Sequence, residues 1–157
     1  MTTLEAGGRT YVVARAVEAD VPAIVGLLTD DPLGATRESE DLEPYLAAFR
    51  RIDADPQHLL VVVRDDADQV VGTMQLTLLP GLARAGATRL QLEAVRLAPT
   101  VRGAGLGAAL FAWAHEYGRA HGASIVQLTT DKRREAAQRF YRRLGYEASH
   151  EGFKLAL

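Results

Sequence analysis

The amino-acid sequence predicts a mixed α/β protein in which helices cover both faces of one sheet. Strand-like and helix-like segments alternate along the chain, and two apolar runs flank the polar turn "DADQ" as in a β-hairpin. The stretch "VRLAPTVRGAGLGAAL" then passes from a strand through three glycines into a helix. At 157 residues the chain is long enough to bury one core. We therefore expect a single domain over 1–157, with its core from about residue 9 onward.

Apolar periodicity predicts the elements of the first half of the chain. Alternation indicates a strand over 9–17, and helical spacing indicates helices over 18–30 and 38–52. The apolar runs 57–65 and 69–79 form the hairpin, and residues 80–87 form a loop. The expected order is therefore strand, helix, helix, strand, strand.

The strand expected over 88–98 changes phase part-way along its length. Leu90 and Leu92 occupy one parity of the strand, whereas Val95 and Leu97 occupy the other. A β-bulge produces such a change, and bulges are frequent beside active sites because they re-aim side chains. The alternative is a strand whose upper part buries both faces.

Helices and strands continue to alternate after the glycines. A helix is expected over 104–122, with one apolar stripe that contains Leu106, Leu110, Trp113 and Tyr117. A buried strand follows over 123–131, then a helix over 132–145 with Phe140 and Tyr141 inward and its basic residues outward. Residues 146–157 are expected to close the chain as two short strands.

Composition restricts the classes of function. The formal net charge of −2 gives no general reason to expect nucleic acid or a membrane surface as a partner, and no apolar run is long enough for a membrane span. The absence of cysteine excludes disulfides, thiolate catalysis and thiolate metal sites. We expect a cytoplasmic protein that binds no metal, because no histidine pair has metal-ligand spacing with acidic support.

The glycine loop is the strongest functional signal. The first N–H groups of a helix have no intrahelical partner, and the helix dipole places its positive end there. Glycines before such a helix let the backbone approach phosphate oxygens, and Arg102 could add a charge-assisted contact. The loop therefore predicts a site for a phosphorylated ligand, with a purely structural tight turn as the alternative.

Two kinds of ligand fit such a loop. Gly103, Gly105 and Ala108 satisfy the dinucleotide pattern G-x-G-x-x-G/A. That pattern also requires further parallel strands and an acidic residue about 20 positions later, whereas Asp131 lies too far on and Pro99 lengthens the turn. A P-loop is excluded because no Lys-Ser/Thr follows. A dinucleotide thus stays a weaker alternative.

The second kind of ligand is indicated by a resemblance. "RGAGLG", Arg102 to Gly107, is similar to the Arg/Gln-x-x-Gly-x-Gly/Ala loop of the GCN5-related N-acetyltransferase (GNAT) family. "AAQRFYRRLGYE" resembles the later A-x-x-x-Y-x-x-x-G-F/Y segment of that family, with Tyr141 and Gly145 in register. The resemblance covers the chain from about residue 9 to its end, and it implies a mostly antiparallel sheet of about six or seven strands.

The resemblance also implies the cosubstrate and its contacts. In that family the loop amides hold the pyrophosphate of acetyl-coenzyme A (acetyl-CoA), and the preceding bulged strand contacts the pantetheine arm and the thioester. Many members carry Asn where this chain has Arg134, which can donate but not accept a hydrogen bond. The implied contacts here are Val95, Arg96, Leu97, Arg102, Gly103, Ala104, Gly105, Leu106, Gly107, Ala108 and Arg134.

Acetyl transfer from a thioester to an amine needs a base for the ammonium proton and an acid for the leaving thiolate. Tyr141 is the candidate acid, since the family places a tyrosine there. An ordinary core aromatic is the alternative. Glu93 is the candidate base, and we expect it to be partly buried with a raised pKa. It could instead pair with an arginine or only bind the substrate's cation.

The sequence leaves the acceptor open. We expect direct transfer in a ternary complex to a primary amine, more readily a small molecule than a protein, and the family suggests a homodimer. Acidic residues at 30–43, among them Asp30, Asp31 and Glu38, are compatible with a cationic amine but also with helix-dipole complementarity. A non-catalytic CoA-binding regulatory module is the second hypothesis, and the dinucleotide-binding protein is the third.

Overall fold

The computed structural model describes residues 1–30 and 38–157. The chain divides into two compact units, residues 1–127 and 128–157, and each is described by itself. Asp31, one of the acidic residues named above, lies outside the described residues. No helix in the described ranges is long and apolar enough to cross a bilayer.

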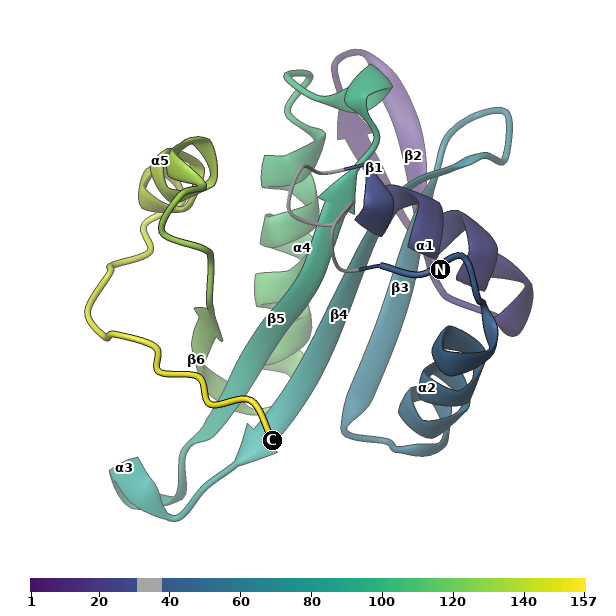
Figure 1. Cartoon of the computed structure of the whole chain (residues 1–157). Coiled ribbons are helices and arrows are strands. Elements are labelled where there is room, and N and C mark those ends of the chain that lie inside the picture. The colour runs from purple at the N-terminus through teal and green to yellow at the C-terminus, as the bar shows by residue number, and fades with distance from the viewer. Residues whose placement is uncertain (31–37) are drawn as a thin grey trace. The chain divides into compact units, whose positions relative to one another are not determined.

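A six-stranded sheet forms the frame of the first unit (Figure 1). The strands stand in sequence order, and each of the first five pairs antiparallel with its neighbour. This confirms the predicted mixed, mostly antiparallel sheet. The strands are β1 (Thr2–Ala6), β2 (Arg9–Arg15), β3 (His58–Arg64), β4 (Val70–Pro80), β5 (Thr88–Leu97) and β6 (Ala123–Leu128).

Helices cover both faces of this sheet, as predicted; Figure 1 shows α4 on one side and α1 with α2 on the other. On the α1–α2 side, Phe49 and Ile24 pack with the sheet residues Leu60 and Val62 in one buried cluster. The helices of this unit are η1 (Glu18–Asp20), α1 (Val21–Thr29), α2 (Glu43–Ala54), α3 (Ala83–Gly86), η2 (Pro99–Val101) and α4 (Leu106–Ala120).

Strand β1 was missed by the sequence reasoning, which started the core near residue 9. It pairs along its whole length with β2, from Thr2 opposite Val13 to Ala6 opposite Arg9. Only Leu4 and Ala6 of this strand are buried, so its sequence lacks the apolar run that reveals the central strands. The fold therefore includes the first residues of the chain.

Helix α4 buries a different stripe from the one expected. Leu106 and Leu110 are buried as predicted, but Trp113 and Tyr117 are only half-buried. Their places in the core are taken by small residues: a Cβ added at Gly118 would lie 3.0 Å from Leu90 Cδ2 of β5. The buried stripe of α4 therefore runs through Leu106, Leu110, Phe111, Ala114 and Gly118, and the helix approaches the sheet most closely at Gly118.

The predicted β-bulge is present in β5. Gln75 of β4 lies opposite Glu93 of β5, and Thr73 of β4 lies opposite Arg96 of β5. Between these two pairs β4 advances by two residues whereas β5 advances by three. The extra residue falls at Ala94, whose φ of 52° is left-handed. This confirms that the change of phase in the sequence marks a bulge.

The second unit contains one helix, α5 (Glu135–Arg143), which is strongly amphipathic. Gly145, with φ of 89°, ends it, and Tyr146 N–H donates to Tyr141 O at 3.1 Å. The two closing strands expected over 146–157 are not formed. The period-two alternation of Phe153, Leu155 and Leu157 is typical of a strand, but a strand forms only against a partner backbone.

Candidate active site

The glycine loop connects the end of β5 to the start of α4. After Leu97 the chain makes the short helix η2, and then Gly103 and Gly105 adopt φ values of 80° and 87°. Left-handed backbone is costly for residues with a Cβ, which explains the glycines at these two positions. Among the residues that the structure describes, none beyond the chain neighbours comes within 4 Å of a Cβ added at either glycine, so this surface of the loop is open to a ligand.

Helix α4 presents its N-terminus to the same open surface. Its first intrahelical bond at this end runs from Ala109 N–H to Gly105 O, at 3.1 Å. The N–H groups of Leu106, Gly107 and Ala108 therefore have no acceptor within the helix. Three such amides beside an open loop form an anion site suited to a pyrophosphate.

The exposed side chain of Arg102 braces this loop. Its Nε donates to Leu97 O at 2.9 Å, and its Nη2 lies 3.4 Å from Asp30 Oδ2 at the end of α1. The sequence suggested a direct contact with the anion. In this structure the guanidinium joins the end of β5 to α1 and so positions the loop, and its contact with an anion stays a prediction.

A second support comes from the β1–β2 turn. A Cβ added at Gly7 would lie 2.8 Å from the Ala104 Cβ and 3.3 Å from the Ala104 carbonyl oxygen. Such close packing of one turn on another requires glycine at position 7, whose φ is 57°. The β1–β2 turn thus fixes the loop from behind.

The backbone of the bulged strand, where the pantetheine contacts were expected, already makes internal bonds. Arg96 Nη1 donates to Val95 O at 2.9 Å, and the Leu97 carbonyl accepts the Arg102 bond. A carbonyl oxygen has two lone pairs, so each can accept a second hydrogen bond. The two arginines stiffen the strand at the point where it bends.

Glu93, the candidate base, lies immediately before the bulge, opposite Gln75. Its side chain is exposed, so the expectation of partial burial is wrong. The register explains the exposure, because Leu90 and Leu92 fill the α4 face while Glu93 points to the opposite face. Solvent can therefore reach this carboxylate directly.

Tyr141 and Arg134 belong to the second unit. Arg134 is the N-cap residue of α5, where its N–H donates to Asp131 O at 2.9 Å. Tyr141 is half-buried, and the centroid of its ring lies 5.7 Å from the ring centroid of Phe140 and 6.1 Å from that of Tyr146. Burial raises the pKa of Tyr146 far above its usual value, and Tyr141 adds to this rise.

Sequence reasoning missed a polar row that continues from Glu93 along the sheet. Thr77 lies opposite Gln91, and Gln91 Oε1 accepts a hydrogen bond of 2.7 Å from Gln127 Nε2 on β6. Gln91 and Gln127 are called the amide pair below. They are 36 residues apart in sequence, so only the pairing of strands brings them together.

The row continues onto β3 through a histidine. His58 Nδ1 lies 2.9 Å from Thr77 Oγ1, and His58 Nε2 lies 3.8 Å from Asp55 Oδ2. Thr77 is only 6% exposed, and the hydrogen bond with the imidazole fixes the position of its hydroxyl. His58 is the first residue of β3, so this contact links β3 to β4 where the polar row ends.

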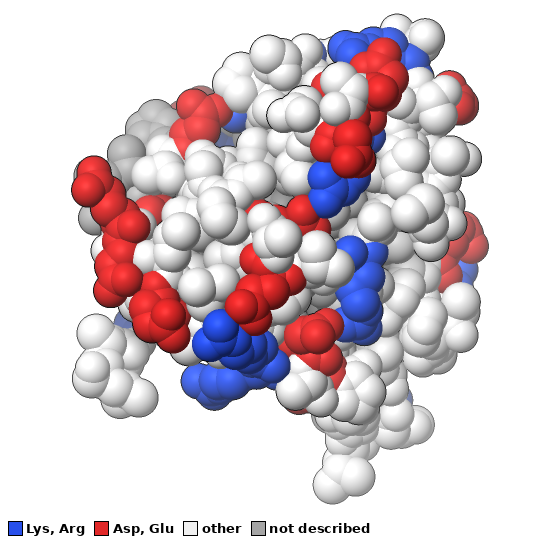
Figure 2. Space-filling view, turned by 90° about the vertical axis from the view of Figure 1, so that its right-hand side faces the viewer, with Lys and Arg blue, Asp and Glu red and all other residues white. Residues whose placement is uncertain are grey.

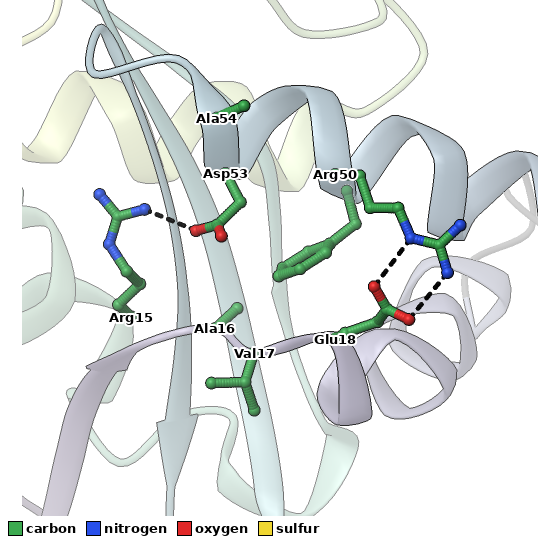
Figure 3. A pocket seen from close by; sticks show the side chains of 8 residues that line it. Arg15, Ala16, Val17, Glu18, Arg50, Asp53 and Ala54 are labelled. Atoms are coloured by element: carbon green, nitrogen blue, oxygen red, sulfur yellow. Dashed lines mark hydrogen bonds and ion pairs between the residues drawn. The ribbon is translucent and has the colours of Figure 1, made fainter.

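A separate pocket of about 440 Å³ lies between α2 and the end of β2 (Figure 3). Two ion pairs flank it: Arg15 with Asp53 at 2.9 Å, and Arg50 with Glu18, which makes two hydrogen bonds of 2.9 Å. Figure 2 likewise shows acidic and basic side chains side by side on the face that carries α1 and α2. None of the predicted site residues lines this pocket.

Comparison with known proteins decides the family. A sequence model of the Acetyltransferase (GNAT) family matches residues 22–146, which include the bulge, the glycine loop and Tyr141. The chain belongs to the GNAT family. This confirms the family expected from the sequence and agrees with the expected acyltransferase class.

Relatives of this GNAT chain carry more than one description. An aminoalkylphosphonate N-acetyltransferase from Salmonella typhimurium is 40% identical over 67 residues, which are 43% of this chain and 44% of that protein. The match thus spans less than half the length of that relative. The crystal structure of a transcriptional regulator from Bacillus halodurans has a TM-score of 0.88 at 38% identity, covering 94% of this chain and 99% of the other. An acetyltransferase from Trypanosoma brucei has a TM-score of 0.76 at 26% identity, with coverage of 94% and 99%.

Proposed function

We propose that the protein transfers the acetyl group of acetyl-CoA to a primary amine of a small molecule, directly and within a ternary complex. The observation that carries this proposal is that a bulge at Ala94 is followed along the chain by an open glycine loop at a helix N-terminus. The loop suits a pyrophosphate, and the bulge interrupts the strand ladder where a thioester would need a backbone donor.

The residues that would hold acetyl-CoA follow from this geometry and from the family pattern. The amides at the start of α4 would bind the pyrophosphate, while Arg102 keeps the loop in place. The bulged strand would bind the pantetheine arm. The full set is Val95, Arg96, Leu97, Arg102, Gly103, Ala104, Gly105, Leu106, Gly107, Ala108 and, from the second unit, Arg134.

The chemistry requires the nitrogen to lose two protons and the thiolate to gain one. The acceptor ammonium loses its first proton to Glu93, directly or through water, and the neutral nitrogen attacks the thioester carbonyl. A C–N bond forms, the C–S bond breaks, and Tyr141 O–H supplies a proton to the departing thiolate. The second proton lost from the nitrogen restores the Tyr141 hydroxyl, directly or through water, and the proton on Glu93 passes to solvent. The chain has no cysteine, so no thioester with the enzyme can intervene.

A small-molecule acceptor is supported by the relative that acetylates aminoalkylphosphonates. The acidic residues around the start of α2, such as Glu38 and Glu43, are compatible with a cationic amine. A homodimer, a cytoplasmic location and the absence of metal and nucleic-acid partners stay predictions.

The first experiment compares melting curves with acetyl-CoA and with NADH. A ligand at 100 times its Kd stabilises the fold by about 2.7 kcal/mol, which raises Tm by several degrees at this size. We expect a shift with acetyl-CoA alone, and a shift with NADH alone would contradict the proposal. Thiol release is then measured with an amine panel that includes 2-aminoethylphosphonate.

Two substitutions test the catalytic roles. Glu93→Gln should lower kcat most at neutral pH and less at alkaline pH, where more of the acceptor is already neutral. Tyr141→Phe should lower kcat with little change in the affinity for acetyl-CoA. Kinetics with two varied substrates should give intersecting lines, whereas parallel lines with an isolable acetyl-enzyme would exclude direct transfer.

The second candidate function is a CoA-binding regulatory module without turnover. It is favoured by the 38% identity to a protein described as a transcriptional regulator. If the protein is such a module, acetyl-CoA should bind, but no amine of the panel should cause thiol release. Thiol release that depends on an amine and is lost in Glu93→Gln would exclude it.

A further inference from the structure

We propose that the amide pair, Gln91 with Gln127, binds a neutral hydrogen-bonding group of the acceptor, about 7 Å along β5 from Glu93. The acceptor class would then be primary amines that carry a carboxamide at this distance from the amine nitrogen. This proposal rests on the function proposed above, since it takes Glu93 as the residue that faces the reacting amine.

The placement follows from strand register. Alternate residues of a strand point to the same face, so Gln91 and Glu93 share a face of β5. The partners across the ladder, Thr77 and Gln75, share this face as well. Gln75 lies opposite Leu60, whose side chain packs under α1 and α2. The row therefore extends the face that these helices cover in part.

The amide pair has hydrogen-bonding capacity left over. Among the described residues, the side-chain bond of this pair is the one from Gln127 Nε2 to Gln91 Oε1. A primary amide offers two N–H donors and a carbonyl oxygen with two lone pairs. Each glutamine therefore keeps at least one free N–H or one free lone pair, and these groups can pair with the N–H and C=O groups of a carboxamide on the acceptor.

Charge favours a neutral group over an ion at this position. Both glutamines are half-buried and uncharged, and Thr77 beside them is fixed by His58. A charged group of either sign placed on them would lose hydration while it faced both Glu93 and Arg89, which lie two residues on either side of Gln91 on the same face of β5, so that one charge offsets the other. A carboxamide exchanges hydrogen bonds with water for equivalent bonds with the pair.

The pair is also held rigidly enough to select a length. Gln91 and Gln127 project from neighbouring strands of the sheet, and their mutual bond of 2.7 Å limits the rotamers of both. Because neutral hydrogen bonds between partly exposed groups add little to the free energy of unfolding, a purely structural role explains the arrangement poorly. Because the amide pair stands at a fixed distance from Glu93, it can select acceptors by the distance between their amine and their carboxamide.

The test measures binding and turnover separately. Isothermal titration in the presence of CoA compares 6-aminohexanamide with hexylamine, and the shorter amides down to glycinamide form a length series. We expect the wild type to bind 6-aminohexanamide about 10-fold more tightly than hexylamine, and glycinamide no better than a plain amine. Gln91→Leu should lose this preference while CoA affinity and hexylamine binding stay unchanged.

Control variants keep the result interpretable. Gln69→Leu makes the same substitution on the exposed turn between β3 and β4 and should leave the preference intact. Gln91→Glu can still accept the bond from Gln127 but adds a carboxylate, so it should favour 1,6-hexanediamine over the amide. Melting curves verify that each variant is folded.

The outcomes separate the two proposals. Equal binding of amide and alkylamine by the wild type, or an unchanged preference in both Gln91 variants, would overturn the role of the amide pair. If the preference exists and disappears in Gln91→Leu, but no amine causes thiol release, the subsite stands and the proposed transfer fails.

Discussion

Replacing Gly105 by alanine should separate acetyl-CoA binding from stability. Gly105 has φ of 87°, and an L residue in left-handed backbone costs about 1–2 kcal/mol. In the described ranges 1–30 and 38–157, no atom beyond the chain neighbours lies within 4 Å of the added Cβ, so the substitution adds strain without a clash there. Each kcal/mol lost lowers Tm by about 2–4 °C for a chain of this size.

Gly122 provides a matched control at the opposite end of α4. Its φ is 77°, and a Cβ there also meets open space. Gly105→Ala and Gly122→Ala should therefore lower Tm by similar amounts. Only the first places a methyl group where the pyrophosphate must approach the amides. Since hydrogen bonds to a charged group contribute about 1.5–3 kcal/mol, losing one should raise the Kd of acetyl-CoA roughly 10- to 100-fold.

Titration calorimetry with acetyl-CoA, together with thermal melting, measures both quantities. If Gly122→Ala weakens acetyl-CoA binding as much as Gly105→Ala does, the effect is general destabilisation. If Gly105→Ala binds acetyl-CoA like the wild type, the pyrophosphate does not lie on this loop, and the reasoning about the site is refuted.

Three further predictions concern stability and the loop. Asp20→Asn removes the charge that faces Arg64, and because the Asp20 side chain is only 7% exposed, the free energy of unfolding in urea should fall by about 3 kcal/mol. Arg102→Met removes the bond to the Leu97 carbonyl, so the Kd of acetyl-CoA should rise about 10-fold; an unchanged Kd would exclude the bracing role. Burial lowers the pKa of His115, so the unfolded chain takes up a proton more readily, and the free energy of unfolding should fall as the pH drops below about 6.5. The fall should be smaller in His115→Gln, as measured by urea titration at neutral and mildly acidic pH.

Local signals in the sequence predicted the parts of the fold that depend on local chemistry. The change of phase between Leu92 and Val95 predicted the bulge, because the alternation of side chains directly records which residues share a face. The glycines predicted the loop, because positive φ is costly for other residues. Both features can be recognised without knowing which strands are neighbours.

Features that depend on pairing between distant segments could not be predicted in this way. The amide pair joins β5 to β6, and the contact of His58 with Thr77 joins β3 to β4. The exposure of Glu93 likewise follows from which face α4 covers. Strand β1 escaped notice because an edge strand with two buried residues leaves almost no apolar pattern.

The contact between Gly7 and Ala104 has a practical consequence for work with this protein. The family match begins at residue 22, so a gene fragment cut to that boundary would still encode every residue of the glycine loop. It would lack the β1–β2 turn on which Ala104 rests, 2.8 Å from where a Cβ would stand at position 7. Such a trimmed protein would carry the complete motif but would lack β1 and β2, the strands that hold this turn in the sheet.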